Sequence, residues 1–194
     1  PLKTALTALC PLLLMALTTI IFSKSFEDKV DNYPLFFFCG EIIFLFLFGS
    51  AYSAMDSVKE NAVYIKSVYL PKHLFVLSSV LQSAVLTVFF AIIILPIMLF
   101  TSAPFSSALL LLPLLIVLMF MFAFGFSLIL AAYKPIIKRL RLIYLVFSFI
   151  WLIGSPVFYP MEIIPEKIRF IFTVNPAVHY MEIMRTICLS LIHI

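Results

Sequence analysis

Few side chains in this sequence have the chemistry of a catalytic or metal-binding group. Glu41 is a lone carboxylate inside the apolar run FFCGEIIF, and His73 and His179 are far from other residues of the ligand type. The three cysteines have neither metal-ligand spacing nor the even number typical of a disulfide framework. The sequence also lacks the GxxxxGK[ST] loop that cradles nucleotide phosphates. These patterns predict a chain that is not an enzyme and that binds no metal or cofactor itself.

Glu41 still carries a site hypothesis. A carboxylate within a membrane span is costly and usually faces a cavity or a polar partner. It follows Tyr33 by about eight residues, or roughly 12 Å of helix. Three interpretations are open: the carboxyl is protonated inside the span, it lines a pore, or it reaches the lipid headgroups beside Tyr33.

The most informative segment is residues 57–74 (SVKENAVYIKSVYLPKHL), a charged stretch between two long apolar runs. Ser57 and Glu60 have the spacing of a capping box, which predicts that a helix begins there, and Pro71 ends it near residue 70. One helical face is formed by residues spaced i, i+4, i+7 and i+11, namely Val58, Ala62, Ile65 and Tyr69, while Lys59 and Lys66 fall on another face. Such a helix either lies on lipid through its apolar face or docks into another protein.

Residues 161–185 are too charged for a membrane span and too apolar for an ordinary loop. Pro165 suits the first turn of a short helix (PEKIRFIFT), and Asn175-Pro176 ends that helix and caps a second one (PAVHYMEIMRT). The pattern predicts two short amphipathic helices. They either dip into the outer leaflet, where protein or a water-filled cavity must surround irregular backbone, or lie flat on the outer surface.

The elements that position these segments are apolar helices. Hydrophobic residues make up 64% of the chain and charged residues 11%, whereas a soluble domain is about half apolar and about a quarter charged. A bilayer core of about 30 Å needs about 20 apolar residues in a helix. Five runs meet this requirement: residues 4–22, 34–54, 74–100, 108–133 and 142–159. The predicted fold is an all-α polytopic membrane protein with five transmembrane helices and a re-entrant helix pair.

The charged residues predict the orientation. Lysine and arginine dominate residues 57–73 and 134–141, whereas most acidic residues lie in residues 23–33 and 161–185. The positive-inside rule puts the first two segments in the cytosol and the last two outside. The formal charge of +4 therefore sits in short loops at a membrane face and does not indicate a nucleic-acid partner.

Two motifs resemble one family. The run NAVYIKSVYLPKH (residues 61–73) resembles the cytoplasmic coupling segment of ABC type-2 permeases, and more narrowly of those that export O-antigen, teichoic acid and other surface polysaccharides. The runs SPVFYP (155–160), PEK (165–167) and NP (175–176), followed by Arg185, resemble the external region between the fifth and sixth spans of that family. The resemblance extends from about Pro11 to Arg185.

The resemblance implies a permease subunit of an ATP-driven exporter of surface polysaccharide or polyol-phosphate polymer, in a bacterial cytoplasmic membrane. The implied partners are an ABC ATPase subunit that binds ATP and Mg, a second copy of the chain, a lipid-linked polysaccharide and membrane lipids. The implied ATPase-coupling residues are Val58, Asn61, Ala62, Ile65, Lys66, Tyr69 and Pro71. The implied re-entrant and exit-gate residues are Ser155, Pro156, Phe158, Tyr159, Pro160, Glu166, Asn175, Pro176 and Arg185.

Two details bear on the substrate. Phe158 and Tyr159 lie near the implied exit, where aromatic rings either stack on sugar faces or simply pack. Glu41 departs from the family, whose members usually carry an apolar residue there, and is a candidate pore carboxylate.

Two other functions stay open. One is a drug or lipid exporter subunit of the same superfamily. The other is a membrane-embedded lipid-linked glycosyl transferase, which needs a carboxylate, histidine or metal cluster beyond Glu41. By the same resemblance residues 1–187 form a single ABC type-2 membrane domain without its N-terminal amphipathic helix and sixth span. Residues 188–194 (CLSLIHI) match either an adapter read-through or the start of another apolar span.

Overall fold

The computed structural model describes residues 2–26, 28–30, 32–63, 70–103 and 105–189, and these residues form helices and turns without strands. Three short 3₁₀ helices, η1 (Ser23–Ser25), η2 (Ser107–Leu111) and η3 (Met161–Ile163), lie between the α-helices. In chain order the α-helices are α1 (Leu2–Phe22), α2 (Tyr33–Glu60), α4 (His73–Phe100), α5 (Leu112–Tyr133), α6 (Leu140–Ile153), α7 (Glu166–Thr173) and α8 (Pro176–Leu189).

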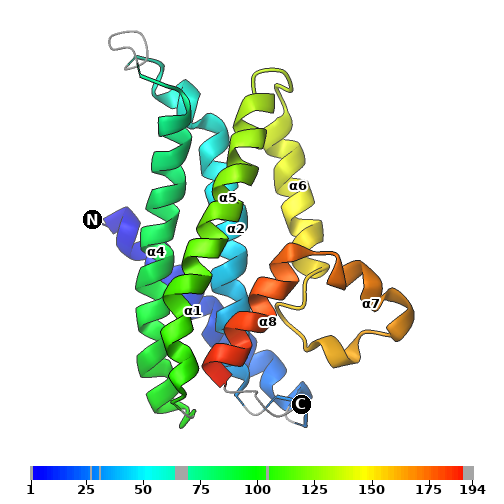
Figure 1. Ribbon diagram of the computed structural model, residues 1–194. Coiled ribbons are helices and arrows are strands. Elements are labelled where there is room, and N and C mark those ends of the chain that lie inside the picture. Colours follow the sequence, from blue (N-terminus) through cyan, green and yellow to red (C-terminus); the bar gives the residue numbers. More distant parts are fainter. Residues whose placement is uncertain (1, 27, 31, 64–69, 104, 190–194) are drawn as a thin grey trace.

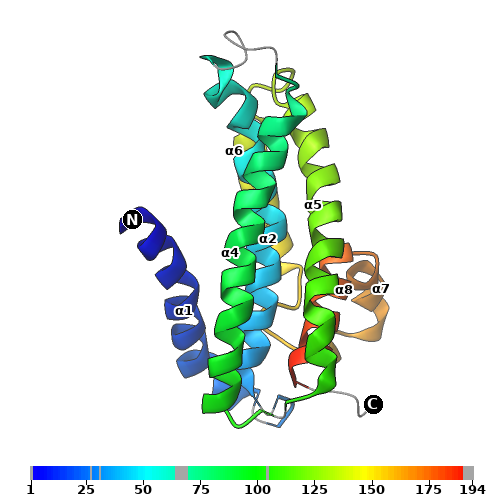
Figure 2. The ribbon, with the colours of Figure 1, turned by 60° about the vertical axis from the view of Figure 1, so that its left-hand side comes forward.

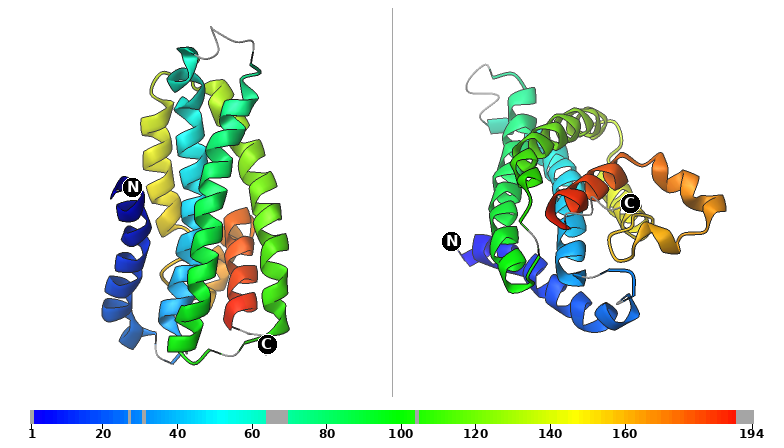
Figure 3. Two further views of the ribbon diagram at one scale, coloured as in Figure 1. Left: turned by 90° about the vertical axis from the view of Figure 1, so that its left-hand side faces the viewer. Right: turned by 60° about the horizontal axis from the view of Figure 1, so that its bottom comes forward.

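Helix α2 is the centre of the bundle (Figure 1; Figure 3) and packs against α1, α4, α5, α6 and α8. In its most apolar stretch 72% of the residues are buried, compared with 28% in α4 and 22% in the stretch that contains α5. A helix that is apolar all round needs neighbours or lipid on every side. Protein covers α2, whereas α4 and α5 leave much of their apolar surface for lipid.

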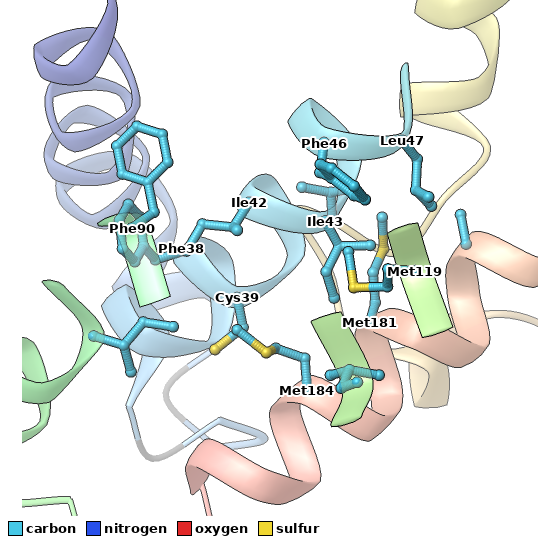
Figure 4. Close-up of a cluster of buried hydrophobic side chains, with 14 of the residues drawn as sticks. Phe38, Cys39, Ile42, Ile43, Phe46, Leu47, Phe90, Met119, Met181 and Met184 are labelled. Atoms are coloured by element: carbon cyan, nitrogen blue, oxygen red, sulfur yellow. The ribbon is translucent and has the colours of Figure 1, made fainter. Parts of the chain in front are cut away.

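The core around α2 is built from large apolar side chains that point toward different neighbours (Figure 4). Phe38 meets Phe90 of α4 edge to face, with ring centroids 6.0 Å apart. Met119 of α5 and Met181 of α8 approach α2 from another side and are almost completely buried. Methionine is flexible enough to fill the irregular gaps left between crossing helices.

Among the described residues, three helical stretches are long and apolar enough to cross a bilayer: α2, α4, and η2 together with α5. The apolar stretch that ends α1 is shorter, and α1 leans away from the bundle toward its N-terminal end (Figure 2). Helix α6 has 14 residues, which is about 21 Å of helix and less than the roughly 30 Å of a hydrocarbon core.

The expected fifth span, residues 142–159, is therefore wrong in its length, because α6 ends at Ile153. Gly154 follows the helix. Pro156 disfavours helical backbone at Ser155, and it has no backbone N–H that could extend the hydrogen bonds of the helix. Residues 154–160 instead form a turn inside the bundle, and apolar composition alone did not reveal it.

The expected helix start at Ser57 is also wrong. Helix α2 continues through this position to Glu60, well beyond the expected end at residue 54. Ser57 is 3% exposed, and its Oγ donates to the carbonyl of Ala54 at 2.7 Å. A serine that bonds within its own helix forms no capping box. Asn61 caps the end of the helix, and its backbone N–H and Nδ2 donate to the carbonyl of Ser57 at 3.2 and 2.7 Å.

The ends of α2, α4 and α5 lie on two opposite faces of the bundle (Figure 1). One face contains the end of α2, the start of α4 and the loop between α5 and α6; the other contains η1 and the end of α8. On the first face Arg141 Nη1 lies 2.6 Å from Asp56 Oδ2, and Lys134 Nζ lies 3.8 Å from Asp56 Oδ1. These ion pairs fix the α5–α6 loop to α2.

We expect the face of Asp56 to be cytoplasmic, because residues 57–73 and 134–141, whose described parts lie there, are rich in lysine and arginine and poor in acidic residues. In cells that express the full-length subunit with Cys10 replaced by serine, Lys24→Cys should react with an impermeant thiol reagent added outside. Lys72→Cys, on the opposite face, should be protected until the cells are opened. Both lysines are exposed, so accessibility should report the side of the membrane. The reverse labelling would overturn this orientation.

Candidate functional site

The backbone between α6 and η3, residues 154–160, forms an irregular turn that we call the post-α6 turn. Ser155 and Val157 are 0% and 1% exposed, and Pro156 and Pro160 are also buried. Buried backbone groups outside helices need other hydrogen-bond partners, above all at membrane depth. Side chains from α2, α8 and the turn itself supply these partners.

Arg185 of α8 supplies most of the donors. Its Nη2 donates to the carbonyls of Pro156 and Val157 at 2.6 and 3.2 Å. Its Nε donates to the carbonyl of Phe36 in α2 at 3.3 Å, and its Cζ lies 3.5 Å from the centroid of the Phe36 ring. The residue is 3% exposed. The planar fork of guanidinium donors thus joins α8, the turn and α2, which the single ammonium of a lysine cannot do in the same way.

Gly40 provides the space for this guanidinium. A Cβ at position 40 would lie 2.9 Å from Arg185 Nη2 and 3.4 Å from the Cα of Val157. The first distance is too short for a real contact, and Nη2 is fixed by two carbonyls. The absence of a side chain at residue 40 is therefore part of the site.

Gly40→Ala should lower the thermal stability of the full-length subunit, whereas Gly49→Ala in the same helix should raise it slightly. Alanine is favoured over glycine in a helix by about 0.5–1 kcal/mol, and nothing lies within 4 Å of a Cβ built at residue 49. At residue 40 the methyl group displaces hydrogen bonds from a charged group, each worth about 1.5–3 kcal/mol. Thermal unfolding of both variants in one detergent measures the difference. Equal stabilisation would show that Arg185 moves aside without cost.

Asn175 connects the beginning of the turn to the beginning of α8. Its Oδ1 accepts hydrogen bonds from the N–H of Ala177 at 2.9 Å and from Trp151 Nε1 at 3.2 Å, and its Nδ2 donates to Ser155 Oγ at 3.1 Å. The sequence-based prediction is confirmed here: Asn175 caps a second short helix that begins at Pro176.

Two tyrosines satisfy further carbonyls. Tyr33, the first residue of α2, donates its hydroxyl to the carbonyl of Phe158 at 2.9 Å. Tyr159 donates to the carbonyl of Ile153 at 2.7 Å, at the open end of α6. The Phe158 ring packs against Phe37 with centroids 5.4 Å apart. The carbonyls of residues 153, 156, 157 and 158 therefore each receive a side-chain donor.

The start of α8 lies near the middle of the bundle's height (Figure 1; Figure 3). A cavity of about 180 Å³ at this point is lined by Phe48 of α2, Phe122 of α5 and Pro176. Phe48 comes 15 residues after Tyr33 and 12 before Glu60, so about 22 and 18 Å of helix separate it from the two ends of α2.

Helix α8 runs from this central point toward the face of η1 and packs against α2 and α5. The alternative of a helix lying flat on the outer surface is therefore wrong for α8. Helix α7 lies beside the bundle (Figure 2), with Ile168, Phe170 and Ile171 exposed. The two helices differ in burial: α8 packs within the bundle, and insertion of the pair from the outer side of the membrane stays a prediction.

Glu41 does not reach the surface of the bundle. It is 5% exposed, and its Oε2 is buried without a hydrogen-bond partner among the described residues. It shares one face of α2 with Phe37 and Phe48, which pack against Phe158 and Trp151. The interpretation that this carboxyl reaches the headgroups is wrong, because protein covers that face of α2. The pore and protonation interpretations stay predictions.

The predicted coupling residues are described in part. Val58 and Ala62 are half-buried at the end of α2, Asn61 is the residue after its last turn, and Pro71 is exposed before α4. The other three lie outside the described residues: Ile65, Lys66 and Tyr69. The proposed apolar face of the coupling segment therefore stays a prediction.

The structure brings most predicted exit residues together and shows others that the sequence did not indicate. Those that meet at the post-α6 turn are Ser155, Pro156, Phe158, Tyr159, Pro160, Asn175, Pro176 and Arg185. Glu166 is apart from them, exposed at the start of α7. Sequence reasoning missed Tyr33, Phe36, Gly40 and Trp151, because each acts through a contact with a residue far away in the chain.

Comparisons with known proteins agree with these features. A family model described as "ABC-2 type transporter" matches residues 2–189. Two curated relatives from Klebsiella pneumoniae, each called "O-antigen export system permease protein RfbA", are 26% and 25% identical to the chain over 167 residues. These alignments cover 86% of this chain and 64% of each relative, so the chain spans less than two thirds of the length of these relatives.

Proposed function

Because the chain belongs to the ABC-2 type transporter family, we propose that it is the membrane permease subunit of an ATP-driven exporter. The observation that carries the proposal is the position of α8, which packs within the bundle and whose start, at mid-height, is joined to an irregular turn held by Arg185, Asn175 and Tyr33. Irregular backbone at membrane depth occurs where protein surrounds it or where it lines a cavity. We infer that α8 and the post-α6 turn form the exit element, in a bacterial cytoplasmic membrane.

The substrate in this proposal is a lipid-linked surface polysaccharide or polyol-phosphate polymer. Its support is the name of the two relatives, which are called O-antigen export permeases, together with the coupling segment at residues 61–73. Phe158 is half-buried, and its ring packs against Phe37. A sugar ring could contact only the part of the Phe158 ring that protein leaves uncovered.

The proposed partners are an ABC ATPase subunit, which binds ATP and Mg, and a second copy of this chain. Helix α2 provides the mechanical connection, because it runs unbroken from Tyr33 to Glu60. Its last turns carry Asp56 beside the coupling segment, and its first turns carry Phe36 and Gly40 beside Arg185. A displacement at the ATPase contact would therefore reach the post-α6 turn through one rigid helix.

We expect Ala62→Arg in the full-length subunit to abolish most export and to reduce co-purification of the ATPase. Ala62 lies two residues beyond the end of α2, where a small side chain permits close approach, and truncating or blocking a central interface residue commonly costs about 2 kcal/mol or more. Glu60→Gln, an exposed change two residues earlier, is the matched control. The measurements are ATPase co-purification and surface polymer in the same cells. Normal values of both for Ala62→Arg would contradict the coupling role.

The substrate class has its own test. Deleting the gene of the full-length subunit should remove the polymer from the cell surface and leave its lipid-linked form inside the cell. Unchanged surface polymer together with increased drug sensitivity would favour a drug exporter instead. Co-purification of the ATPase with the Ala62→Arg variant tests the coupling role whatever the substrate is.

A further inference from the structure

A second cavity lies on the face of Asp56, between the ends of α2, α4 and α5. Its volume is about 760 Å³, within the range of roughly 300–1,000 Å³ that is typical of small-molecule pockets. The residues that line it include Lys59, Lys72, Lys134 and Lys138. We call it the lysine pocket.

The charge of the lysine pocket is strongly one-sided. Four lysines and His73 line it, and Asp56 is the carboxylate that faces them. Both ion pairs found within the described ranges use Asp56, one to Arg141 at 2.6 Å and one to Lys134 at 3.8 Å. The other three lysines of the pocket form no ion pair with a described residue: Lys59, Lys72 and Lys138.

The inner wall of the pocket is apolar. Met55 of α2, Val76 of α4 and Leu128 of α5 form it, and Met55 and Val76 are 2% exposed. The three helices end at this level, where the apolar spans meet the loops (Figure 1). An apolar wall below a ring of cations matches a molecule with an anionic head and an acyl body.

We propose that the lysine pocket binds the phosphate group of an anionic glycerophospholipid. Three helix ends from separate parts of the chain converge on it, so the fold brings these lysines together at one place. Basic pockets between helices at a membrane surface bind such headgroups by charge, and their apolar walls accommodate the glycerol and upper acyl carbons. The bound lipid would brace the ends of α2 and α4 on either side of the coupling segment.

The main competing occupant is an acidic surface of the ATPase subunit. The apolar wall favours lipid, because Leu128 and Val76 line the pocket from within the spans. If an acidic protein surface occupied the pocket, these apolar side chains would contact charged groups. A free phosphate ion would use the lysines but gain nothing from this wall. The test below separates all three occupants.

The experiment uses the full-length subunit in detergent micelles, with retained lipids counted by native mass spectrometry. Phosphatidylglycerol should bind in preference to phosphatidylcholine. Lys72→Gln combined with Lys138→Gln should weaken phosphatidylglycerol binding by roughly tenfold or more, because each lysine near an anionic headgroup contributes substantially to affinity. Lys24→Gln with Lys167→Gln removes the same charge elsewhere and should change binding little. All four lysines are exposed, so these variants should fold.

Three outcomes would overturn the proposal. One is equal binding of phosphatidylglycerol by both double variants. Another is displacement of the lipid by inorganic phosphate at comparable concentration, which would make the pocket a free-anion site. The third is loss of ATPase co-purification by the Lys72/Lys138 variant with unchanged lipid binding, which would assign the lysines to the protein partner. Because lipid binding is measured without ATP, its failure leaves the exporter function untouched.

Discussion

Arg185→Met should unfold or inactivate the full-length subunit more severely than any other single change at the post-α6 turn. The variant leaves the buried carbonyls of Pro156 and Val157 without their donor, and each orphaned buried group costs about 1–3 kcal/mol. It also removes a contact with the Phe36 ring of about 2 kcal/mol in a desolvated setting. We expect a large fall in thermal stability and no measurable export.

One effect opposes this result. Removing a buried cation also removes its desolvation penalty, which reaches several kcal/mol per ion. Three carbonyl acceptors and an aromatic face should outweigh that penalty here, because each lies within hydrogen-bonding or ring-contact distance of the guanidinium. If Arg185→Met lowers the stability, the carbonyl acceptors and the Phe36 ring outweigh the desolvation penalty of the guanidinium; if it raises the stability, they do not.

Arg169→Met is the matched control for this prediction. It makes the same chemical change at a guanidinium whose one hydrogen bond among the described residues, to the carbonyl of Met161, is 3.5 Å long. We expect a small effect on stability and normal export. Arg185→Lys should fall between the two, since one ammonium cannot reach α2 and both turn carbonyls at once. An Arg185→Met variant as stable as the Arg169→Met control would refute the role of Arg185 in holding the turn.

Local sequence signals predicted those parts of the fold that depend on neighbouring residues. The Asn175-Pro176 pair marked the break between α7 and α8, because an asparagine cap and a proline in the first turn act within a few residues of themselves. Apolar length predicted α2, α4 and α5, because their composition alone requires lipid or protein on all sides.

Signals that depend on distant partners were not visible in the sequence. The apolar run of residues 142–159 looked long enough to span a bilayer, yet α6 ends at Ile153 because the turn finds its donors on α2 and α8. The same holds for Gly40, whose importance arises from close contacts with Val157 and with Arg185, which is 145 residues later in the chain. Ser57 misled for the opposite reason: it resembled a cap, but its hydroxyl bonds within its own helix.

The site residues also divide by what the sequence could reveal. The external motif placed Ser155, Asn175 and Arg185 in one region, and the structure explains their grouping through hydrogen bonds to the turn. The coupling residues are different, because their proposed contacts lie with another protein. Their role depends on an interface that no intramolecular contact of this chain can reveal.

Asn175→Leu should remove both the cap of α8 and the hydrogen bonds that join it to the post-α6 turn. We expect it to block export while the subunit still inserts into the membrane. The change removes the acceptor of the Ala177 N–H and of Trp151 Nε1, and the donor to Ser155 Oγ, at the middle of the bundle. Loss of an asparagine cap costs about 0.5–2 kcal/mol, and the unsatisfied indole and hydroxyl groups add to it because water is scarce at that depth. Combining it with Pro176→Ala should be worse, since α7 and α8 can then fuse into one helix.

Ser155→Ala distinguishes the cap from the turn contact, because it removes the acceptor of Asn175 Nδ2 and leaves Asn175 Oδ1 as the acceptor for Ala177 and Trp151. We expect this variant to retain the protection of the first α8 amides against hydrogen exchange, whereas Asn175→Leu should lose it. Combining Ser155→Ala with Asn175→Leu completes a double-mutant cycle that measures the contact between Asn175 and Ser155. The decisive measurement is surface export of the native polymer alongside amide exchange. Normal export by Asn175→Leu, with α8 amides still protected, would show that this cap is not needed to hold the exit element, and the site would then rest on Arg185 and Tyr33 alone.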